Sequence, residues 1–240
     1  MLTFTSMNRR LPWLLALWAA MAAGCFNVTD EVTLEAGGGG TFLTRIDATR
    51  MMEMMKMMET MVPDSAGGQP SLKDMNLKDS LQKTWTDLEK TPGISEVKRT
   101  VENDAVFIVS FRFSDVAALN RALASRSKDS AGNVKDPSSY TLESGRLVCN
   151  LNSLTGMGDM MKGLGEMPGS DADSLAASME MIKMMLGDMK YTTIHRLPGK
   201  VVDYTNKKAK LSPDGRSVTL EIDLLEPESM HSLHNDIKFK

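Results

Sequence analysis

Methionine is the residue type with the most unusual chemistry in this chain. The sequence has 21 methionines among its 240 residues, and many of them gather over residues 51–61. Thioether sulfur is a soft ligand that suits Cu(I) better than oxygen does. Met-x-Met and Met-x-x-Met spacings in this stretch predict one alternative function, a Cu(I) or Ag(I) site. Its candidate ligands are Met51, Met52, Met54, Met55, Met57 and Met58.

Packing offers a second interpretation of the same methionines. With about 100° between successive residues of a helix, Met51, Met54, Met55, Met58 and Met61 share one arc, and the charged residues lie opposite. Methionine favours helices and fills irregular gaps in cores. Met-rich faces also adapt to apolar partners. We therefore expect this helix face to pack in the core, or to bind an apolar protein or lipid. Packing explains Met52 and Met57 least, because they flank the stripe.

The first residues have the pattern of an export signal. Arg9 and Arg10 precede an apolar run over 11–23, which is shorter than the roughly 20 residues that a membrane-spanning helix needs. A positive segment, a short apolar segment and small residues at the end are typical of a cleaved signal peptide. We therefore predict that residues 1–24 are removed and that the mature chain begins at Cys25.

The cleavage region, Ala22-Ala-Gly-Cys25, resembles the lipobox that the lipoprotein signal peptidase reads, with Ala22 where that pattern prefers Leu. The resemblance implies lipidation of Cys25 by a diacylglyceryl thioether and usually a further acyl chain, such as palmitate, on its amino group. Two or more chains hold a protein stably on a membrane. Ordinary secretion, with Cys25 as a thiol, is the alternative. With Cys25 lipidated, Cys149 has no disulfide partner.

These features predict a place in the cell envelope. Phe26 is not the Asp associated with inner-membrane retention, which favours the outer membrane, and the sequence does not choose between its periplasmic and surface faces. Loss of Arg9 and Arg10 changes the formal charge from −3 to −5. A mildly acidic chain gives no reason to expect nucleic acid or an anionic membrane surface as a partner.

No arrangement of residues in the sequence predicts catalysis. The chain lacks a Gly-x-Ser-x-Gly elbow, a phosphate-binding loop and a His-Glu-x-x-His motif. His231 and His234 share a spacing of three residues, but no third ligand accompanies them, so we expect two surface histidines. We expect no enzymatic activity, no catalytic residue and no cofactor.

The elements that would position these residues alternate between strand pairs and helices. We expect strands around a turn at residues 37–40, a pair over 94–113, a pair over 140–151 and further strands over 190–226. Residues 105–113 are the strongest strand and the expected centre of the sheet. We expect helices over 47–62, 72–90, 114–124 and 173–188. The prediction is an α+β fold, a largely antiparallel sheet packed against Met-rich amphipathic helices. Residues 25–226 form one domain, and residues 227–240 a polar tail.

Two segments resemble known families. The early motifs Glu31-Val-Thr-Leu34 and Gly40-Thr41, followed by the methionines, are similar to envelope lipoproteins of the Bacteroidetes type. Residues 197–206 and 211–220 resemble the end of the LppM-like lipoprotein domain. Neither resemblance implies a catalytic residue. The sequence therefore predicts a membrane-anchored envelope lipoprotein with a non-enzymatic binding or structural role.

Overall fold

Two β-sheets, an 11-residue α-helix and two short helical segments form the described part of the molecule. The computed structural model describes residues 26–53, 56, 85, 88–126, 138–151, 189–224 and 233–240. Its first residue, Phe26, begins strand β1 and belongs to the core, and all other described core residues follow it. The chain from Phe26 therefore contains the whole described fold.

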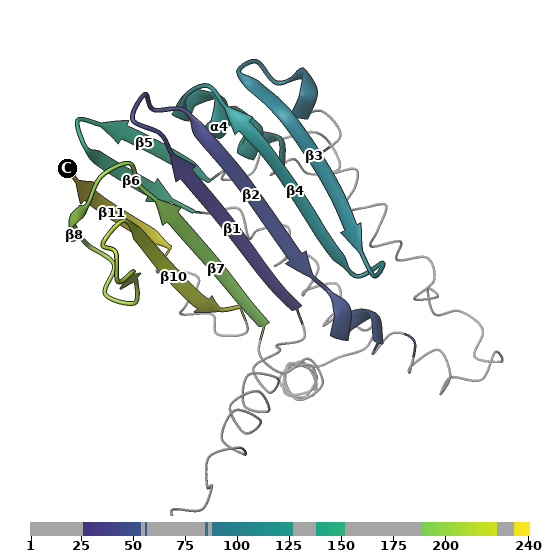
Figure 1. Cartoon of the computed structure of the whole chain (residues 1–240). Coiled ribbons are helices and arrows are strands. Elements are labelled where there is room, and N and C mark those ends of the chain that lie inside the picture. Colours follow the sequence, from purple (N-terminus) through teal and green to yellow (C-terminus); the bar gives the residue numbers. More distant parts are fainter. Residues whose placement is uncertain are drawn as a thin grey trace, which may run out of the picture.

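The larger sheet has seven strands. Their order is β3 (Ile94–Glu102), β4 (Val106–Phe113), β2 (Gly40–Asp47), β1 (Phe26–Leu34), β7 (Met189–Arg196), β10 (Ser217–Asp223) and β9 (Lys210–Leu211) (Figure 1). All neighbouring strands are antiparallel except β1 and β7, which run parallel from Phe26 beside Met189 to Thr33 beside Arg196. The first strand of the fold therefore lies at the centre of this sheet.

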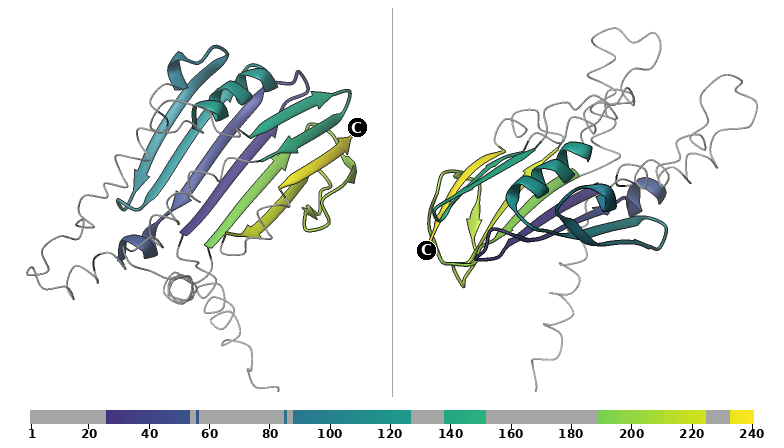
Figure 2. Two further views of the ribbon diagram at one scale, coloured as in Figure 1. Left: turned by 180° about the vertical axis from the view of Figure 1, so that it is seen from behind. Right: turned by 90° about the horizontal axis from the view of Figure 1, so that it is seen from above.

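The smaller sheet is wholly antiparallel. Its order is β5 (Ser139–Glu143), β6 (Arg146–Asn150), β11 (His234–Phe239) and β8 (Val201–Tyr204). Together with helix α4 (Val116–Arg126) it lies over one face of the larger sheet, here called the inner face (Figure 2).

Alternating side chains explain why the strands stack in this way. Along β1, each second residue from Phe26 to Leu34 is buried, which is the period expected when one face of a strand packs on a core. The matching positions of β2, β4, β7 and β10 are also buried. Together with side chains of α4 and the smaller sheet they make one hydrophobic core.

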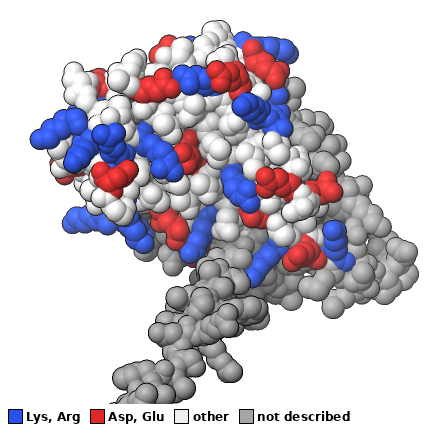
Figure 3. Space-filling view, viewed as in Figure 1, with Lys and Arg blue, Asp and Glu red and all other residues white. Residues whose placement is uncertain are grey.

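The opposite, outer face of the larger sheet is covered by charged side chains. Cross-strand ion pairs join Arg45 to Glu102, Arg112 to Glu35, Arg196 to Glu31 and Lys190 to Glu221. The mixture of blue and red over the sheet in Figure 3 shows this face. Exposed pairs of this kind add little stability, about 0–1 kcal/mol each, so they serve mainly to keep the face solvated.

Local side chains set the starts of two helices. The Asp115 Oδ1 accepts a hydrogen bond from the Ala118 N–H at 2.7 Å, which caps α4. This bond and that from Ser114 lower the pKa of Asp115. The Asp47 Oδ1 likewise accepts a hydrogen bond from the Thr49 N–H, at the start of the helical residues 49–53.

A short 3-10 helix, η2 (Leu88–Lys90), lies beside β3. Among the described helices, none combines the length and hydropathy needed to cross a membrane.

The structure confirms the strand pairs and the largely antiparallel sheet, and it corrects three details. The larger sheet is mixed because of β1 and β7. Residues 105–113 are not its centre, since β4 is second from the edge. The predicted tail contains β11, an inner strand of the smaller sheet in which Ile237 is completely buried. Helices are few in the described part. The predicted Met-rich helix over 47–62 is described only at residues 47–53 and at Lys56, and the one over 173–188 lies outside the described residues.

Candidate ligand-binding site

The described part of the chain contains two of the predicted site residues. Met51 is only 8% exposed and belongs to the hydrophobic core, and Met52 packs against that core while partly buried. Both side chains therefore contact the core, including that of Met52, which the helical stripe explained least, and metal binding by either stays a prediction. Cys25, Met54, Met55, Met57 and Met58 lie outside the described residues. Within the described ranges, no three His, Cys, Asp or Glu side chains group in a way that suits a metal ion.

The remaining cysteine and histidines differ in their surroundings. Cys149 is a buried free thiol, and burial raises its pKa well above the ordinary value. His234 is exposed on β11, as expected for a surface residue, with its Nδ1 2.6 Å from the Asn150 Oδ1. His231 lies outside the described residues. His195, on β7, is buried in the core.

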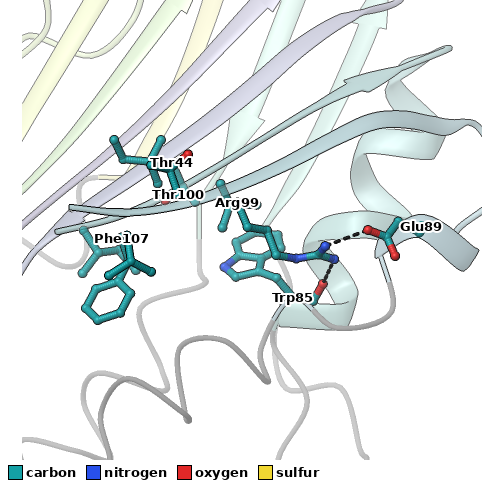
Figure 4. Close-up of a pocket in the computed structure, with 10 residues that line it drawn as sticks. Thr44, Trp85, Glu89, Arg99, Thr100 and Phe107 are labelled. Atoms are coloured by element: carbon teal, nitrogen blue, oxygen red, sulfur yellow. Dashed lines mark hydrogen bonds and ion pairs between the residues drawn. The ribbon is translucent and has the colours of Figure 1, made fainter. Parts of the chain in front are cut away.

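A cavity of about 380 Å³ opens on the inner face, beneath the β3 end of the larger sheet (Figure 4). Its volume lies within the range of small-molecule sites, about 300–1,000 Å³. The walls come from three neighbouring strands and the segment around η2. They are Thr44 and Ile46 of β2, Arg99, Thr100 and Val101 of β3, Phe107, Ile108 and Val109 of β4, and Trp85 and Glu89.

The strand register explains why these side chains converge. Arg99 pairs with Val109 and Val101 pairs with Phe107, so all four lie on the same face of the sheet. Ile46 of the next strand pairs with Phe107 and extends that face. Three adjacent strands thus present a mostly aliphatic and aromatic floor.

Trp85 forms one wall of the cavity and joins an aromatic cluster. Its side chain is buried, with ring centroids 6.1 Å from Phe42 and 6.3 Å from Phe111. Phe42 and Phe111 stack at 5.1 Å. Such contacts hold large side chains in fixed orientations, so this wall is preorganised. Trp85 is also the only tryptophan after the predicted leader, since the other two are Trp13 and Trp18.

Arg99 supplies the positive charge at the cavity. It donates hydrogen bonds to the Glu89 Oε1 at 2.7 Å and to the Trp85 carbonyl oxygen at 2.8 Å, both drawn in Figure 4. These bonds hold the guanidinium at the edge of the cavity, beside Glu89. Arginine has five N–H donors, and the bonds to described residues use one on each terminal nitrogen. The Nε and the remaining terminal N–H groups therefore suit a carboxylate or phosphate oxygen.

Behind the cavity lies a buried polar group that can anchor the floor. The Thr44 hydroxyl donates to the Asp30 Oδ1 at 2.5 Å, and the Tyr191 hydroxyl donates to the Asp30 Oδ2 at 2.8 Å. Asp30 is only 3% exposed. Both carboxyl oxygens are thus held by donors from the strands on either side of β1, which fixes β2 and β7 against it.

His195 extends this polar region along β7 and is enclosed by the core. Burial lowers its pKa to about 4, although nearby Asp30 acts in the opposite direction. Its Nε2 lies 3.4 Å from the Tyr140 hydroxyl, and its Nδ1 has no hydrogen-bond partner among the described residues. The ring is 2% exposed.

Comparisons with known proteins identify one similar structure. No family model matches the sequence, and no curated protein matches it. The chain is similar to the folded domain of the LppM protein of Mycobacterium tuberculosis, solved by NMR. The TM-score is 0.39 and the identity is 10%, over 90% of each chain. This likeness is distant and concerns the fold.

The sequence contained partial indications of the cavity and of the buried polar group around Asp30. Trp85 and Leu88 fit the apolar spacing of the predicted helix over 72–90, and both are buried. Asp30 shares the strand parity of Val28 and Val32, so it stands out as a carboxyl at an inward position. Arg99 and Glu89 had no such indication, because their meeting depends on how η2 packs beside β3.

Proposed function

We propose that this protein is a lipid-anchored lipoprotein of the cell envelope and that its domain binds an amphiphile without chemical conversion. The ligand has an apolar chain and one acidic group. The observation that carries this proposal is the cavity, in which Arg99 lies at the rim of a floor made by Ile46, Val101, Phe107 and Val109.

The division of chemistry within the cavity supports that ligand class. Apolar side chains favour a hydrocarbon chain because burial removes it from water, at about 25 cal/mol per Å² of apolar surface. Arg99 favours an acid over an alcohol or amine, because charge-assisted hydrogen bonds are stronger than neutral ones. Glu89 competes for the same guanidinium and is exposed, so an acidic group can replace it without leaving a buried charge.

The binding test uses Trp85 as its reporter. The chain from Phe26 is titrated with dodecanoate, dodecanol and dodecylamine, and both Trp85 emission and heat of binding are followed. We expect dodecanoate to change the emission and to bind more tightly than the other two. Arg99→Gln should weaken dodecanoate by about 10–100-fold, the effect of losing a hydrogen bond to a charged group.

Arg121→Gln is the matched control. Arg121 also donates to a carbonyl oxygen, that of Pro92 at 2.9 Å, but it does not line the cavity. The Arg121→Gln variant should bind dodecanoate as tightly as the unaltered chain does. Equal affinity for all three amphiphiles, or no change in Trp85 emission at saturation, would contradict the proposal.

The anchor requires a separate experiment, because the cavity does not bear on it. Mass spectrometry of the mature N-terminus from the native host should find a diacylglyceryl group on Cys25, with an acyl chain on its amino group. Cys25→Ser should release the protein from membranes that are washed with high salt, because salt weakens contacts made by charge alone. A mature chain that begins elsewhere, or an unmodified Cys25, would refute the anchor and leave the cavity proposal standing. Fractionation of the two membranes tests the expected outer-membrane location.

A further inference from the structure

The charge of this acidic chain is distributed unevenly. Its formal net charge is −3, yet residues 197–216 contain five basic and only two acidic side chains. In Figure 3 blue side chains gather at the left, where β8 and the C-terminal end lie in Figure 1. From the net charge alone we expected no attraction to an anionic membrane. That sum does not show that basic residues are concentrated in one segment.

Backbone hydrogen bonds hold the segments with these basic residues together, and the Val201 N–H donates to the Gly215 carbonyl oxygen at 2.8 Å, which joins β8 to the turn after β9. Lys200 and Lys240 exchange two backbone hydrogen bonds, at 2.8 and 2.9 Å, which fix them side by side. Asn206 fixes the next turn: its N–H donates to the Asn235 Oδ1, and its side-chain oxygen accepts from the Lys208 N–H. Lys207 lies in that turn. We call the surface formed by Lys200, Val202, Lys207, Lys210, Leu211 and Lys240 the basic end.

Nearby acidic side chains are engaged elsewhere. Asp203 pairs with Lys238 at 3.8 Å, and Asp236 pairs with Arg146 at 2.5 Å. Asp214 accepts hydrogen bonds from the Ser212 hydroxyl and the Arg216 N–H. By contrast, Lys200, Lys207, Lys210 and Lys240 are exposed and form no ion pair with any described residue. The basic end therefore has an excess of positive charge that its own neighbours do not balance.

Apolar side chains are exposed among these lysines. Val202 is 54% exposed and Leu211 is 43% exposed, and they are two of the three large hydrophobic residues exposed in the described part. Both lie on edge strands, β8 and β9. Lysines around exposed aliphatic side chains match an anionic bilayer, which offers phosphate groups at the surface and acyl chains beneath. A soluble polyanion would use the lysines but not Val202 or Leu211.

We propose that the basic end binds the surface of a membrane that contains anionic phospholipids. This contact lies far from the predicted anchor. Because β1 and β7 are parallel, Phe26 lies at one end of the paired strands, and Lys200 follows the other end. Seven residue steps at about 3.3 Å separate Phe26 from Thr33, or about 23 Å. Membrane contact at both places lays the strands along the bilayer instead of upright on it.

The test uses the chain from Phe26, so that no lipid or leader contributes to binding. Flotation with vesicles of equal parts phosphatidylcholine and phosphatidylglycerol is compared with vesicles of phosphatidylcholine alone. We expect binding only to the anionic vesicles, and we expect it to fall as salt is raised. The double variant Lys207→Gln/Lys210→Gln should bind about 30-fold more weakly, since each lysine near an anionic surface contributes about fivefold.

Lys90→Gln/Lys98→Gln is the matched control, because it removes the same charge at the opposite edge of the larger sheet and should bind as before. Val202→Ser/Leu211→Ser should also weaken vesicle binding while leaving the charge unchanged. Equal binding to neutral vesicles, or an equal loss in the control variant, would overturn the proposal. So would tight binding to polyglutamate that prevents vesicle binding and is unaffected by the serine variant, since the basic end would then be a site for a soluble polyanion.

Discussion

Replacing Tyr191 by Phe tests the buried polar group around Asp30 with the smallest change of shape. The Tyr191 hydroxyl donates to the Asp30 Oδ2 at 2.8 Å, and both residues are at most 3% exposed. Water cannot readily take the place of the missing hydroxyl there, so the carboxyl loses a donor. Removing one partner from a buried polar group costs about 1–3 kcal/mol. For a domain of this size, about 2 kcal/mol lowers the melting temperature by roughly 4–8 °C.

The assay is urea unfolding of the chain from Phe26, followed by Trp85 fluorescence and by far-ultraviolet circular dichroism. Tyr204→Phe serves as the control, because Tyr204 is only partly buried on β8. It should change the free energy of unfolding by less than about 0.5 kcal/mol. Thr44→Val removes the other donor, and a double variant with Tyr191→Phe should show a non-additive effect because both bonds reach Asp30. If the free energy of unfolding of Tyr191→Phe equals that of Tyr204→Phe, the hydrogen bond from Tyr191 to Asp30 does not hold β1 and β7 together as inferred.

Three further experiments test other parts of the fold. His195 is held neutral with a pKa of about 4, below its unfolded value near 6.5. The unfolded chain therefore binds a proton first, and stability present above about pH 6.5 falls by up to about 3 kcal/mol as the pH drops toward 4. His195→Gln should lose this part of the pH dependence in urea titrations, and an unchanged slope would contradict it. Cys149 should not react with a thiol reagent at neutral pH until the chain unfolds, because burial removes access and raises its pKa; rapid labelling of the folded chain would argue against that burial. Gly40→Ala would place a Cβ 1.9 Å from the Thr33 carbonyl oxygen, whereas a Cβ at Gly37 meets nothing within 4 Å. We expect a loss of about 1–3 kcal/mol or more for the first and little change for the second in thermal melts, and equal melting temperatures would refute the close approach.

Local patterns in the sequence were sufficient to predict most of the strand pairs. Alternation over residues 26–34, the break at residues 102–104 and the Ser144-Gly145 turn correspond to β1, the β3–β4 connection and the β5–β6 hairpin. Ser144 and Gly145 have φ values of 43° and 79°, which suits the tight turn of a two-residue hairpin. These features depend on neighbours in the chain, so a single sequence contains them.

Features that depend on distant segments could not be predicted in the same way. Nothing local indicates that β1 pairs with β7, since 163 positions separate Phe26 from Met189. The strand β11 was missed because its six residues include only two large apolar side chains, Ile237 and Phe239. The cavity depends on Arg99 meeting Glu89 and on Trp85 lying against Phe42. The basic end was concealed because the acidic net charge sums over residues that never lie together.

The parallel pairing of β1 and β7 has a consequence for the order in which the protein folds. The strands β1, β2, β3 and β4 all lie in the first half of the chain, so they can pair before synthesis is complete. The other edge of β1 has no strand beside it until residues 189–196 emerge. An open central edge is a template for wrong pairing with other chains, and long-range parallel pairs form slowly. Folding of the larger sheet should therefore finish late, and the interval before β7 docks is when the chain is most exposed to aggregation.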